Sequence, residues 1–237
     1  MKSEITKRLI ITGTSRGIGK YLAEYYLRKG YKVAGCSRSS ASVEHDNYMH
    51  YSLSVSDEKS VVNMVKDVAR KWGGIDILIN NAGMASMNHI ILTPLKTVKD
   101  ILETNLVGTF LFVREAAKIM LKHKYGRIVN ISTVAVPLSL DGEGAYVASK
   151  SAVEAFTRVA ARELGPYNIT VNAVGIAPLK TRLMRTVPKE KIDNILRLMT
   201  IPRLTEFRDV VNVIDFFIKE ESDFITGQVI YLGGVWH

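Results

Sequence analysis

Tyr146 and Lys150 are the two residues of this sequence whose types and spacing best suit proton transfer. Residues four apart on a helix lie one above the other on the same face, so a phenol and an ammonium at these positions are neighbours. An adjacent ammonium stabilises the ionised phenol and lowers its pKa from about 10 towards neutrality. We therefore interpret the pair as a proton donor and acceptor at working pH. Tyr25 and Lys29 have the same spacing, so the interpretation depends on further motifs.

The first of these motifs is a glycine-rich turn between the first predicted strand and the first predicted helix. Glycines let the backbone bend sharply and approach a pyrophosphate, and the helix N-terminus behind them offers free N–H groups. A tight connection without a ligand is the simpler alternative, but the position directly after strand one favours binding. The expected cofactor residues in this turn are Gly13, Ser15, Arg16, Gly17, Ile18 and Gly19.

The end of the second predicted strand indicates which dinucleotide binds. An NAD site usually has an acidic residue there, which binds the ribose 2′-hydroxyl. Here Ser37 and Arg38 are followed by no carboxylate before Glu44. Arg38 and Arg16 can converge on a 2′-phosphate, which guanidinium matches in charge and geometry. The sequence therefore predicts NADP(H); the alternative is that both arginines are merely exposed.

An Asn-Asn-Ala-Gly segment follows the fourth predicted strand, at the carboxyl edge where ligands bind in open α/β sheets. Its small residues leave room for a cofactor ribose, and its asparagines can tie neighbouring strands together. We expect Asn81, Ala82 and Gly83 to contact the cofactor, although the segment by itself is also compatible with an ordinary turn.

Short apolar runs alternate with longer segments of helical periodicity along the chain. The predicted strands cover residues 8–12, 32–36, 48–53, 75–79, 127–131, 169–174 and 228–232. The predicted helices cover residues 18–28, 57–72, 95–102, 107–122, 145–164, 189–198 and 207–218. Ser56 is the expected cap of the second helix. Repeated β-α units predict one α/β domain over 1–237, a single Rossmann-type, doubly wound parallel sheet of about seven strands with helices on both faces.

Composition and charge restrict the class of protein. Hydrophobic residues make up 47% of the 237 residues, as in a globular protein, and no apolar run reaches the length of a membrane span. We expect no signal peptide, and the single cysteine, Cys36, excludes an internal disulfide framework and suits a reducing cytoplasm. The net charge is +9, but no basic run with interleaved aromatic residues is present. We therefore expect a cytoplasmic protein without membrane or nucleic-acid partners.

Together these motifs resemble the short-chain dehydrogenase/reductase family, and the match covers nearly the whole chain. The shared patterns are Thr-Gly-x-x-x-Gly-x-Gly at 12–19, Asn-Asn-Ala-Gly at 80–83 and Tyr-x-x-x-Lys at 146–150. Asn105 falls where the family has its catalytic asparagine. Within the family, the sequence is most similar to the bacterial 3-oxoacyl-acyl-carrier-protein reductases, including Ile-Thr-Gly-Gln at 225–228.

The resemblance implies hydride transfer between nicotinamide C4 and a carbonyl or alcohol carbon of the substrate. Tyr146 would give a proton to the developing alkoxide, and Lys150 would lower the tyrosine pKa and bind the nicotinamide ribose. Asn105 would hold a water that links Lys150 to solvent. The family's carboxamide-binding positions correspond to the Leu179 backbone and Thr181. No metal is expected.

Several positions depart from the family pattern. The family's catalytic serine lies thirteen residues before the tyrosine, where this chain has Thr133; threonine keeps the hydroxyl but adds a methyl group and a stiffer χ1. Ser132 is the alternative hydroxyl, although on a strand it should face the other way. The family's Pro-Gly turn is replaced by Gly-Ile-Ala-Pro at 175–178. The carrier-protein reductases of the family dock their acidic carrier protein on two basic residues. In this chain the corresponding positions are Lys124, which keeps the charge, and Tyr167, which does not.

We therefore predict an NADPH-dependent oxidoreductase of the short-chain type. Its first candidate substrate is a 3-oxoacyl thioester, linked to carrier protein or coenzyme A, and its second is a keto-sugar or other small ketone. A non-catalytic NADP-binding protein is the alternative from another class, supported by Thr133 and the altered turn. Residues 179–204 are expected to form a substrate lid with a cationic rim. The residues expected on its apolar inner face are Leu183, Met184, Ile195, Leu198 and Met199. The family implies a homo-oligomer, a tetramer or dimer, formed through the two long central helices.

Overall fold

The structure is a computed structural model that describes residues 6–179 and 189–235. Its centre is one parallel sheet of seven strands in the order β3-β2-β1-β4-β5-β6-β7. The strands are β1 (Arg8–Thr12), β2 (Lys32–Ser37), β3 (Tyr48–Ser52), β4 (Ile77–Asn80), β5 (Gly126–Thr133), β6 (Ile169–Ile176) and β7 (Val229–Tyr231). Because the order reverses between β1 and β4, the sheet is doubly wound and the predicted fold class is confirmed.

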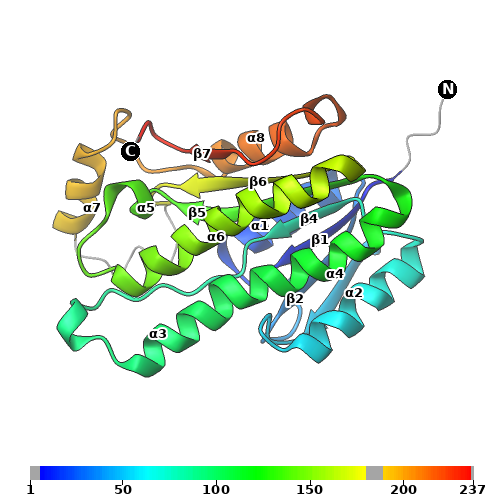
Figure 1. Cartoon of the computed structure of the whole chain (residues 1–237), viewed down its shortest axis with the longest axis horizontal. Coiled ribbons are helices and arrows are strands. Elements are labelled where there is room, and N and C mark those ends of the chain that lie inside the picture. Colours follow the sequence, from blue (N-terminus) through cyan, green and yellow to red (C-terminus); the bar gives the residue numbers. More distant parts are fainter. Residues whose placement is uncertain (1–5, 180–188, 236–237) are drawn as a thin grey trace.

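Helices cover both faces of the sheet (Figure 1). They are α1 (Gly17–Arg28), α2 (Glu58–Trp72), α3 (Leu95–Leu102), α4 (Gly108–His123), α5 (Ala135–Leu138), α6 (Gly144–Leu164), α7 (Lys189–Arg197) and α8 (Phe207–Ile218). The long helices α4 and α6 run side by side on one face together with α2, whereas α1 and α8 pack on the other. Among the helices of the described residues, none is long and apolar enough to cross a membrane.

The core consists of two apolar layers, one on each face of the sheet. A parallel strand covered on both faces is apolar along its length, and all four residues of β4 are buried. Ile10 packs in the layer beneath α4 with Phe112, while its neighbour Leu9 packs in the opposite layer with Phe217 of α8. This alternation is the two-residue period of a strand, and it fixes which side chains each helix meets.

Two local features differ from the sequence-based expectations. The N-cap of α2 is Asp57 and not Ser56, because the Asp57 carboxylate accepts a hydrogen bond from the N–H of Ser60. The Ser56 hydroxyl pairs with that of Ser54 instead, at 3.0 Å. A π-helical turn, Glu103–Val107, joins α3 to α4, where the periodicity of the sequence gave no indication of one.

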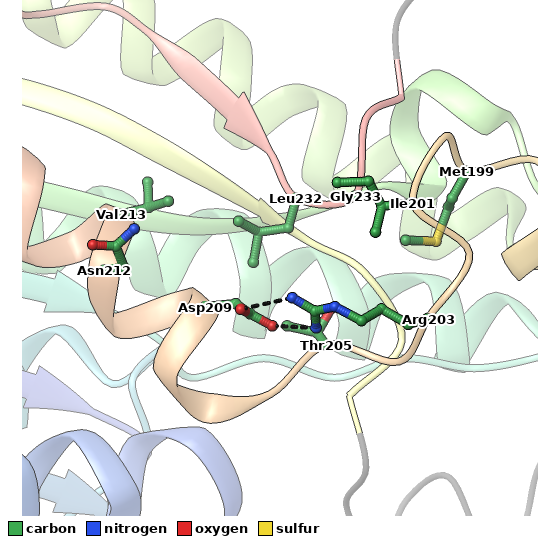
Figure 2. Close-up of a pocket in the computed structure, with 9 residues that line it drawn as sticks. All are labelled: Met199, Ile201, Arg203, Thr205, Asp209, Asn212, Val213, Leu232 and Gly233. Carbon is green, nitrogen blue, oxygen red and sulfur yellow. Dashed lines mark hydrogen bonds and ion pairs between the residues drawn. The ribbon is translucent and has the colours of Figure 1, made fainter.

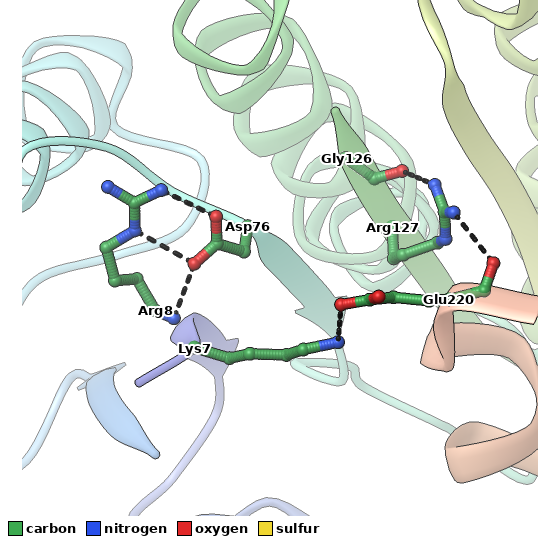
Figure 3. Close-up of polar contacts among 6 residues, drawn as sticks. All are labelled: Lys7, Arg8, Asp76, Gly126, Arg127 and Glu220. Carbon is green, nitrogen blue, oxygen red and sulfur yellow. Dashed lines mark hydrogen bonds and ion pairs between the residues drawn. The ribbon is translucent and has the colours of Figure 1, made fainter. Parts of the chain in front are cut away.

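Polar contacts fasten the amino ends of the central strands (Figure 3). Arg8 of β1 donates to both carboxylate oxygens of Asp76, just before β4, at 2.8 and 2.6 Å. Arg127 of β5 is 1% exposed and donates to the carbonyl oxygens of Gly126 and Glu220. These contacts hold the strands in register, so that their carboxyl ends, where the motifs of the sequence lie, meet at one edge.

Candidate active site

The glycine-rich turn after β1 and the Asn-Asn-Ala-Gly segment after β4 are bonded together at the carboxyl edge of the sheet. Thr12 Oγ1 accepts hydrogen bonds from the N–H groups of Asn81 and Ala82, at 3.0 and 2.9 Å. The side-chain amide of Asn81 donates to the carbonyl oxygens of Thr12 and Gly13, at 2.8 and 3.3 Å. The two motifs therefore form one floor, and the Asn81 amide is bonded within it.

The glycines of the turn meet two different demands. Gly13 and Gly17 have φ of +76° and +59°, in the left-handed region that favours glycine. A Cβ at Gly19 would lie 2.2 Å from the Gly13 carbonyl oxygen, so the helix could not begin so close to the turn with any other residue. A Cβ at Gly17 would meet nothing within 4 Å, which shows that this part of the backbone borders open space.

The first turn of α1 is available to an anion. Its N-cap is Arg16, whose side chain makes no capping hydrogen bond in the described structure, and the turn carries no acidic residue. Free N–H groups and the helix dipole at such an end suit a phosphate. Ser15 and Ile18 are partly exposed beside it, and Arg16 is exposed. The open backbone and uncapped helix together fit the pyrophosphate of a dinucleotide.

The end of β2 is tied to the same turn. The N–H groups of Gly13 and Thr14 both donate to the Cys36 carbonyl oxygen, at 2.8 and 3.1 Å. The next two residues are Ser37, which is buried, and Arg38, which is exposed. Arg38 and the exposed Arg16 therefore lie on two adjacent connections at the same edge of the sheet.

Helix α6 carries Tyr146 and Lys150 against the end of β5. Lys150 is 4% exposed, and its ammonium donates to the Ile131 carbonyl oxygen at 2.6 Å. The Thr133 hydroxyl, two residues further along β5, accepts from the Ala135 N–H at 3.1 Å and lies close enough to Tyr146 to lower the pKa of its phenol. Two positions of β5, Ile131 and Thr133, thus face the two motif residues of the helix.

Burial controls the pKa values of both residues. Although Tyr146 is only partly buried as a residue, desolvation raises the pKa of its phenol to about 12. Thr133 lowers this pKa, and the charge of Glu143 raises it further. Desolvation lowers the pKa of Lys150 to about 8, against the opposing attraction of Glu154. The expected fall in the Tyr146 pKa is therefore absent from this structure, because burial disfavours the phenolate and the ammonium is bonded to a backbone carbonyl.

Asn105 lies in the π-helical turn between α3 and α4 and is completely buried. Its Oδ1 accepts from the Met84 N–H at 2.7 Å, and its Nδ2 donates to the Met84 carbonyl and to Ser149 Oγ, both at 2.9 Å. A Cβ at Gly83 would lie 3.4 Å from Asn105 Oδ1 and 3.6 Å from Lys150 Nζ. The structure thus brings together Gly83, Asn105 and Lys150, which are far apart in the sequence. Single π-turns of this kind often occur at functional sites.

Ser132 and Thr133 face opposite sides of β5. Ser132 is 2% exposed and donates to Glu154 Oε1 at 2.5 Å, while Glu154 Oε2 accepts from the Tyr231 hydroxyl at 2.7 Å. Of the two neighbouring hydroxyls, that of Thr133 is the one beside Tyr146. Sequence reasoning missed Glu154, although its position four residues after Lys150 was a signal that the two share a helix face.

The predicted lid is anchored at both ends. Leu179 is 6% exposed and forms a parallel bridge with Thr205, whose N–H donates to the Pro178 carbonyl oxygen at 2.8 Å. Arg203 donates to both carboxylate oxygens of Asp209, at 2.6 and 2.9 Å (Figure 2). A cavity of about 160 Å³ lies beside this ion pair; of the predicted site residues that the structure describes, none lines it.

Part of the predicted lid lies outside the described residues, including Thr181, Leu183 and Met184. In the remainder, Met199 is 5% exposed and packs with Ile195 of α7, as an apolar inner face requires. Leu198 differs from the expectation: it is 57% exposed.

Known reductases match this chain over nearly its whole length. A family model described as enoyl-(acyl carrier protein) reductase matches residues 13–236. A 3-oxoacyl-[acyl-carrier-protein] reductase of Vibrio cholerae is 31% identical over 234 residues, which are 96% of this chain and 96% of that protein. One from Staphylococcus aureus is 31% identical over 242 residues, 98% of each. The chain belongs to the short-chain dehydrogenase/reductase family of oxidoreductases.

Solved structures with this fold include enzymes that hold different dinucleotides. ElxO with NADP bound is 30% identical, with a TM-score of 0.89 and coverage of 96% of this chain and 97% of that one. A xylitol dehydrogenase bound to NAD+ is 26% identical, with a TM-score of 0.90 and coverage of 98% and 100%. The fold alone therefore does not decide the cofactor.

Proposed function

We propose that the chain is an NADPH-dependent reductase that transfers hydride between nicotinamide C4 and a carbonyl or alcohol carbon. One observation carries the proposal: residues from three elements meet at this edge of the sheet, with Asn105 and Lys150 beside Gly83 and with Thr133 of β5 beside Tyr146 of α6. The nicotinamide supplies or accepts the hydride when it is bound. The side chains bind, orient and move the proton.

The proposed cofactor contacts use the whole carboxyl edge. The uncapped first turn of α1 and the open backbone at Gly17 receive the pyrophosphate. Arg16 and Arg38 receive the 2′-phosphate, since the turn after β2 offers guanidinium groups and no carboxylate before Glu44. Ser37 and the floor of Asn81, Ala82 and Gly83 line the riboses, and Leu179 with Thr181 holds the carboxamide. The NADP-bound structure of ElxO supports this choice.

Tyr146 is the proposed general acid. Its raised pKa, about 12, keeps the phenol protonated at neutral pH, as donation to a developing alkoxide requires. The Thr133 hydroxyl, which lies beside that phenol, binds the same substrate oxygen. Lys150, with a pKa of about 8, is mainly protonated at neutral pH and binds the nicotinamide ribose hydroxyls beside Gly83.

Asn105 supports this arrangement in two ways. Its side chain bonds Ser149 Oγ, which donates in turn to the Tyr146 carbonyl oxygen at 2.7 Å, so it fixes the helical turn that carries the acid. We further assign to Asn105 a water that connects Lys150 with solvent and returns the proton after each turnover. The π-turn makes the position special, because it interrupts the regular hydrogen bonding between α3 and α4.

A 3-oxoacyl thioester is the first substrate that we propose, since two relatives at 31% identity reduce the 3-oxoacyl group on acyl carrier protein. Lys124, exposed at the end of α4, offers one cation to an acidic carrier, but Tyr167, 47% exposed, offers none. A keto-sugar or other small ketone is the second candidate, supported by the likeness to xylitol dehydrogenase.

Four further features complete the proposal. Residues 1–237 form a single dinucleotide-binding domain, and residues 179–204 close over the substrate as a lid that is held at Thr205 and Asp209. The enzyme works in the cytoplasm as a homo-oligomer that pairs through α4 and α6.

A screen of NADPH oxidation against 3-oxoacyl thioesters and small ketones tests the function. Consumption of NADPH with a 3-oxoacyl thioester supports the first substrate, and consumption with ketones or keto-sugars alone supports the second. Tight NADPH binding without turnover of any panel member would favour the non-catalytic alternative.

A further inference from the structure

The edge strand β3 presents a polar side-chain face to the end of β2. Tyr48, His50 and Ser52 alternate along β3, so they point to the same side of the strand. Their strand is paired in parallel with β2, with Gly35 opposite His50 and Ser37 opposite Ser52. All three side chains reach turns that follow β1 or β2, and no role in the proposed chemistry uses them.

Two of these side chains hold the backbone of the turn that carries Arg38. The Ser39 carbonyl oxygen lies 2.9 Å from His50 Nε2 and accepts from Ser37 Oγ at 2.8 Å. The Arg38 carbonyl oxygen accepts from Ser52 Oγ at 3.5 Å. The carbonyl groups of Arg38 and Ser39 are therefore both hydrogen-bonded to side chains of β3. The contact with His50 is the shorter of the two.

The same histidine is linked to the glycine-rich turn. His50 Nδ1 lies 3.0 Å from the Tyr48 hydroxyl, which lies 2.9 Å from Thr14 Oγ1. The link requires Gly35, because a Cβ there would lie 2.2 Å from the Tyr48 hydroxyl and 2.4 Å from Thr14 Oγ1. A chain of hydrogen bonds thus runs from the turn after β1 to Ser39 in the turn after β2.

The direction of these hydrogen bonds follows from the partners. A carbonyl oxygen accepts and cannot donate, so His50 Nε2 carries the proton that is shared with Ser39. In the neutral ring, His50 Nδ1 accepts a hydrogen bond from the Tyr48 hydroxyl, and that hydroxyl accepts one from Thr14 Oγ1. In the charged ring, Nδ1 donates to the Tyr48 hydroxyl, which then donates to Thr14 Oγ1. His50 Nε2 donates to Ser39 in both forms of the ring, so this hydrogen bond to the turn does not depend on the charge of His50.

We propose that His50 is a positioning residue for cofactor selection: it holds the turn after β2 so that the Arg38 guanidinium meets the 2′-phosphate of NADPH. The inference rests on the proposed NADPH dependence and on the role given there to Arg38. NADH lacks the 2′-phosphate, so its binding does not depend on the placement of that guanidinium. Loss of the hydrogen bond from His50 to Ser39 therefore weakens the binding of NADPH and leaves that of NADH nearly unchanged.

Fluorescence titration of the purified protein with NADPH and with NADH tests the inference. His50→Ala should raise the Kd for NADPH about three- to tenfold, the range of a lost hydrogen bond, and change the Kd for NADH by less than about twofold. His50→Gln should restore the wild-type Kd, because its side-chain amide can donate to the Ser39 carbonyl. His45→Ala is the matched control: that histidine accepts a hydrogen bond from Asn47 in its own turn and is exposed.

Arg38→Ala separates failure of the inference from failure of the proposed function. If the wild type binds both dinucleotides equally, or Arg38→Ala leaves their ratio unchanged, the proposed basis of NADPH selection is wrong. If Arg38→Ala abolishes the preference while His50→Ala leaves it intact, or weakens both dinucleotides alike, the positioning role of His50 alone is overturned. A preference reduced by His50→Ala and restored by His50→Gln supports the inference.

Discussion

Thr133 places its hydroxyl against the Tyr146 phenol, while the hydroxyl of Ser132 is bonded to buried Glu154. We expect Thr133→Ala to lower kcat by about ten- to a hundredfold, since one positioned hydrogen bond to the reacting oxygen is lost. Thr133→Ser keeps the hydroxyl and should retain most activity. Steady-state kinetics of these variants and of Ser132→Ala show which hydroxyl binds the substrate oxygen. A larger loss of kcat in Ser132→Ala than in Thr133→Ala would show that Ser132 supplies it.

Glu154 is the residue through which the pH dependence can be tested. Its negative charge raises the pKa of Lys150, which burial has lowered to about 8. The other ionisable groups around Glu154 are Tyr231 of β7 and, interacting with that tyrosine, Arg158 of α6. Glu154→Gln removes that attraction, so the pKa of Lys150 falls further and the ammonium loses its proton at lower pH. The alkaline limb of kcat/KM should therefore move to lower pH by about half a unit to one unit.

Tyr231→Phe is the control for this prediction, because it removes a hydrogen bond to the Glu154 carboxylate and keeps the charge. Its alkaline limb should stay near that of the wild type. An unshifted limb in Glu154→Gln would contradict the electrostatic role.

The sequence predicted that Tyr146 and Lys150 are neighbours on a helix, but it did not predict the direction of the tyrosine pKa shift. The spacing of Tyr146 and Lys150 was sufficient to place both on one face of α6. The pKa of the tyrosine was predicted to fall, yet burial raises it, because desolvation depends on the packing of β5 and α6 and not on spacing within the helix. The Glu154 contacts were likewise hidden, since Ser132 and Tyr231 belong to two other elements.

At the scale of elements, the cap of α2 provides a direct test of the structure. Asp57 accepts from the backbone N–H of Ser60 and also from its hydroxyl, at 2.7 Å. Asp57→Ala should therefore lower the free energy of unfolding, since the helix loses its N-cap. Urea denaturation of Asp57→Ala and Ser56→Ala measures this; an equal or larger loss in Ser56→Ala would restore the cap first predicted from the sequence.

The ends of the predicted strands fall within two residues of those in the structure. Such agreement was possible because parallel strands covered on both faces are short apolar runs with polar or glycine-containing ends. The π-turn at Glu103–Val107 was not predictable in the same way, because it depends on how α3 and α4 dock and leaves the apolar period unbroken.

At the scale of the whole molecule, the outer face of α4 and α6 is the proposed interface between subunits. Phe110 of α4 is 42% exposed and its ring centroid lies 5.7 Å from that of Phe156 of α6, and Val159 further along α6 is 56% exposed. Val159→Asp would place a charge in a buried apolar contact, so we expect it to lower the molar mass in solution. Light scattering after gel filtration measures the mass; a monomeric wild type would contradict the proposed interface.

The role of Tyr146 in reducing a carbonyl is the central claim, and Tyr146→Phe tests it most directly, because the change removes one hydroxyl. NADPH oxidation with the best substrate of the panel should fall at least about a hundredfold, the scale of acid catalysis, while the Kd for NADPH stays near that of the wild type. Turnover close to the wild-type rate in purified Tyr146→Phe, with NADPH still bound, would contradict the account.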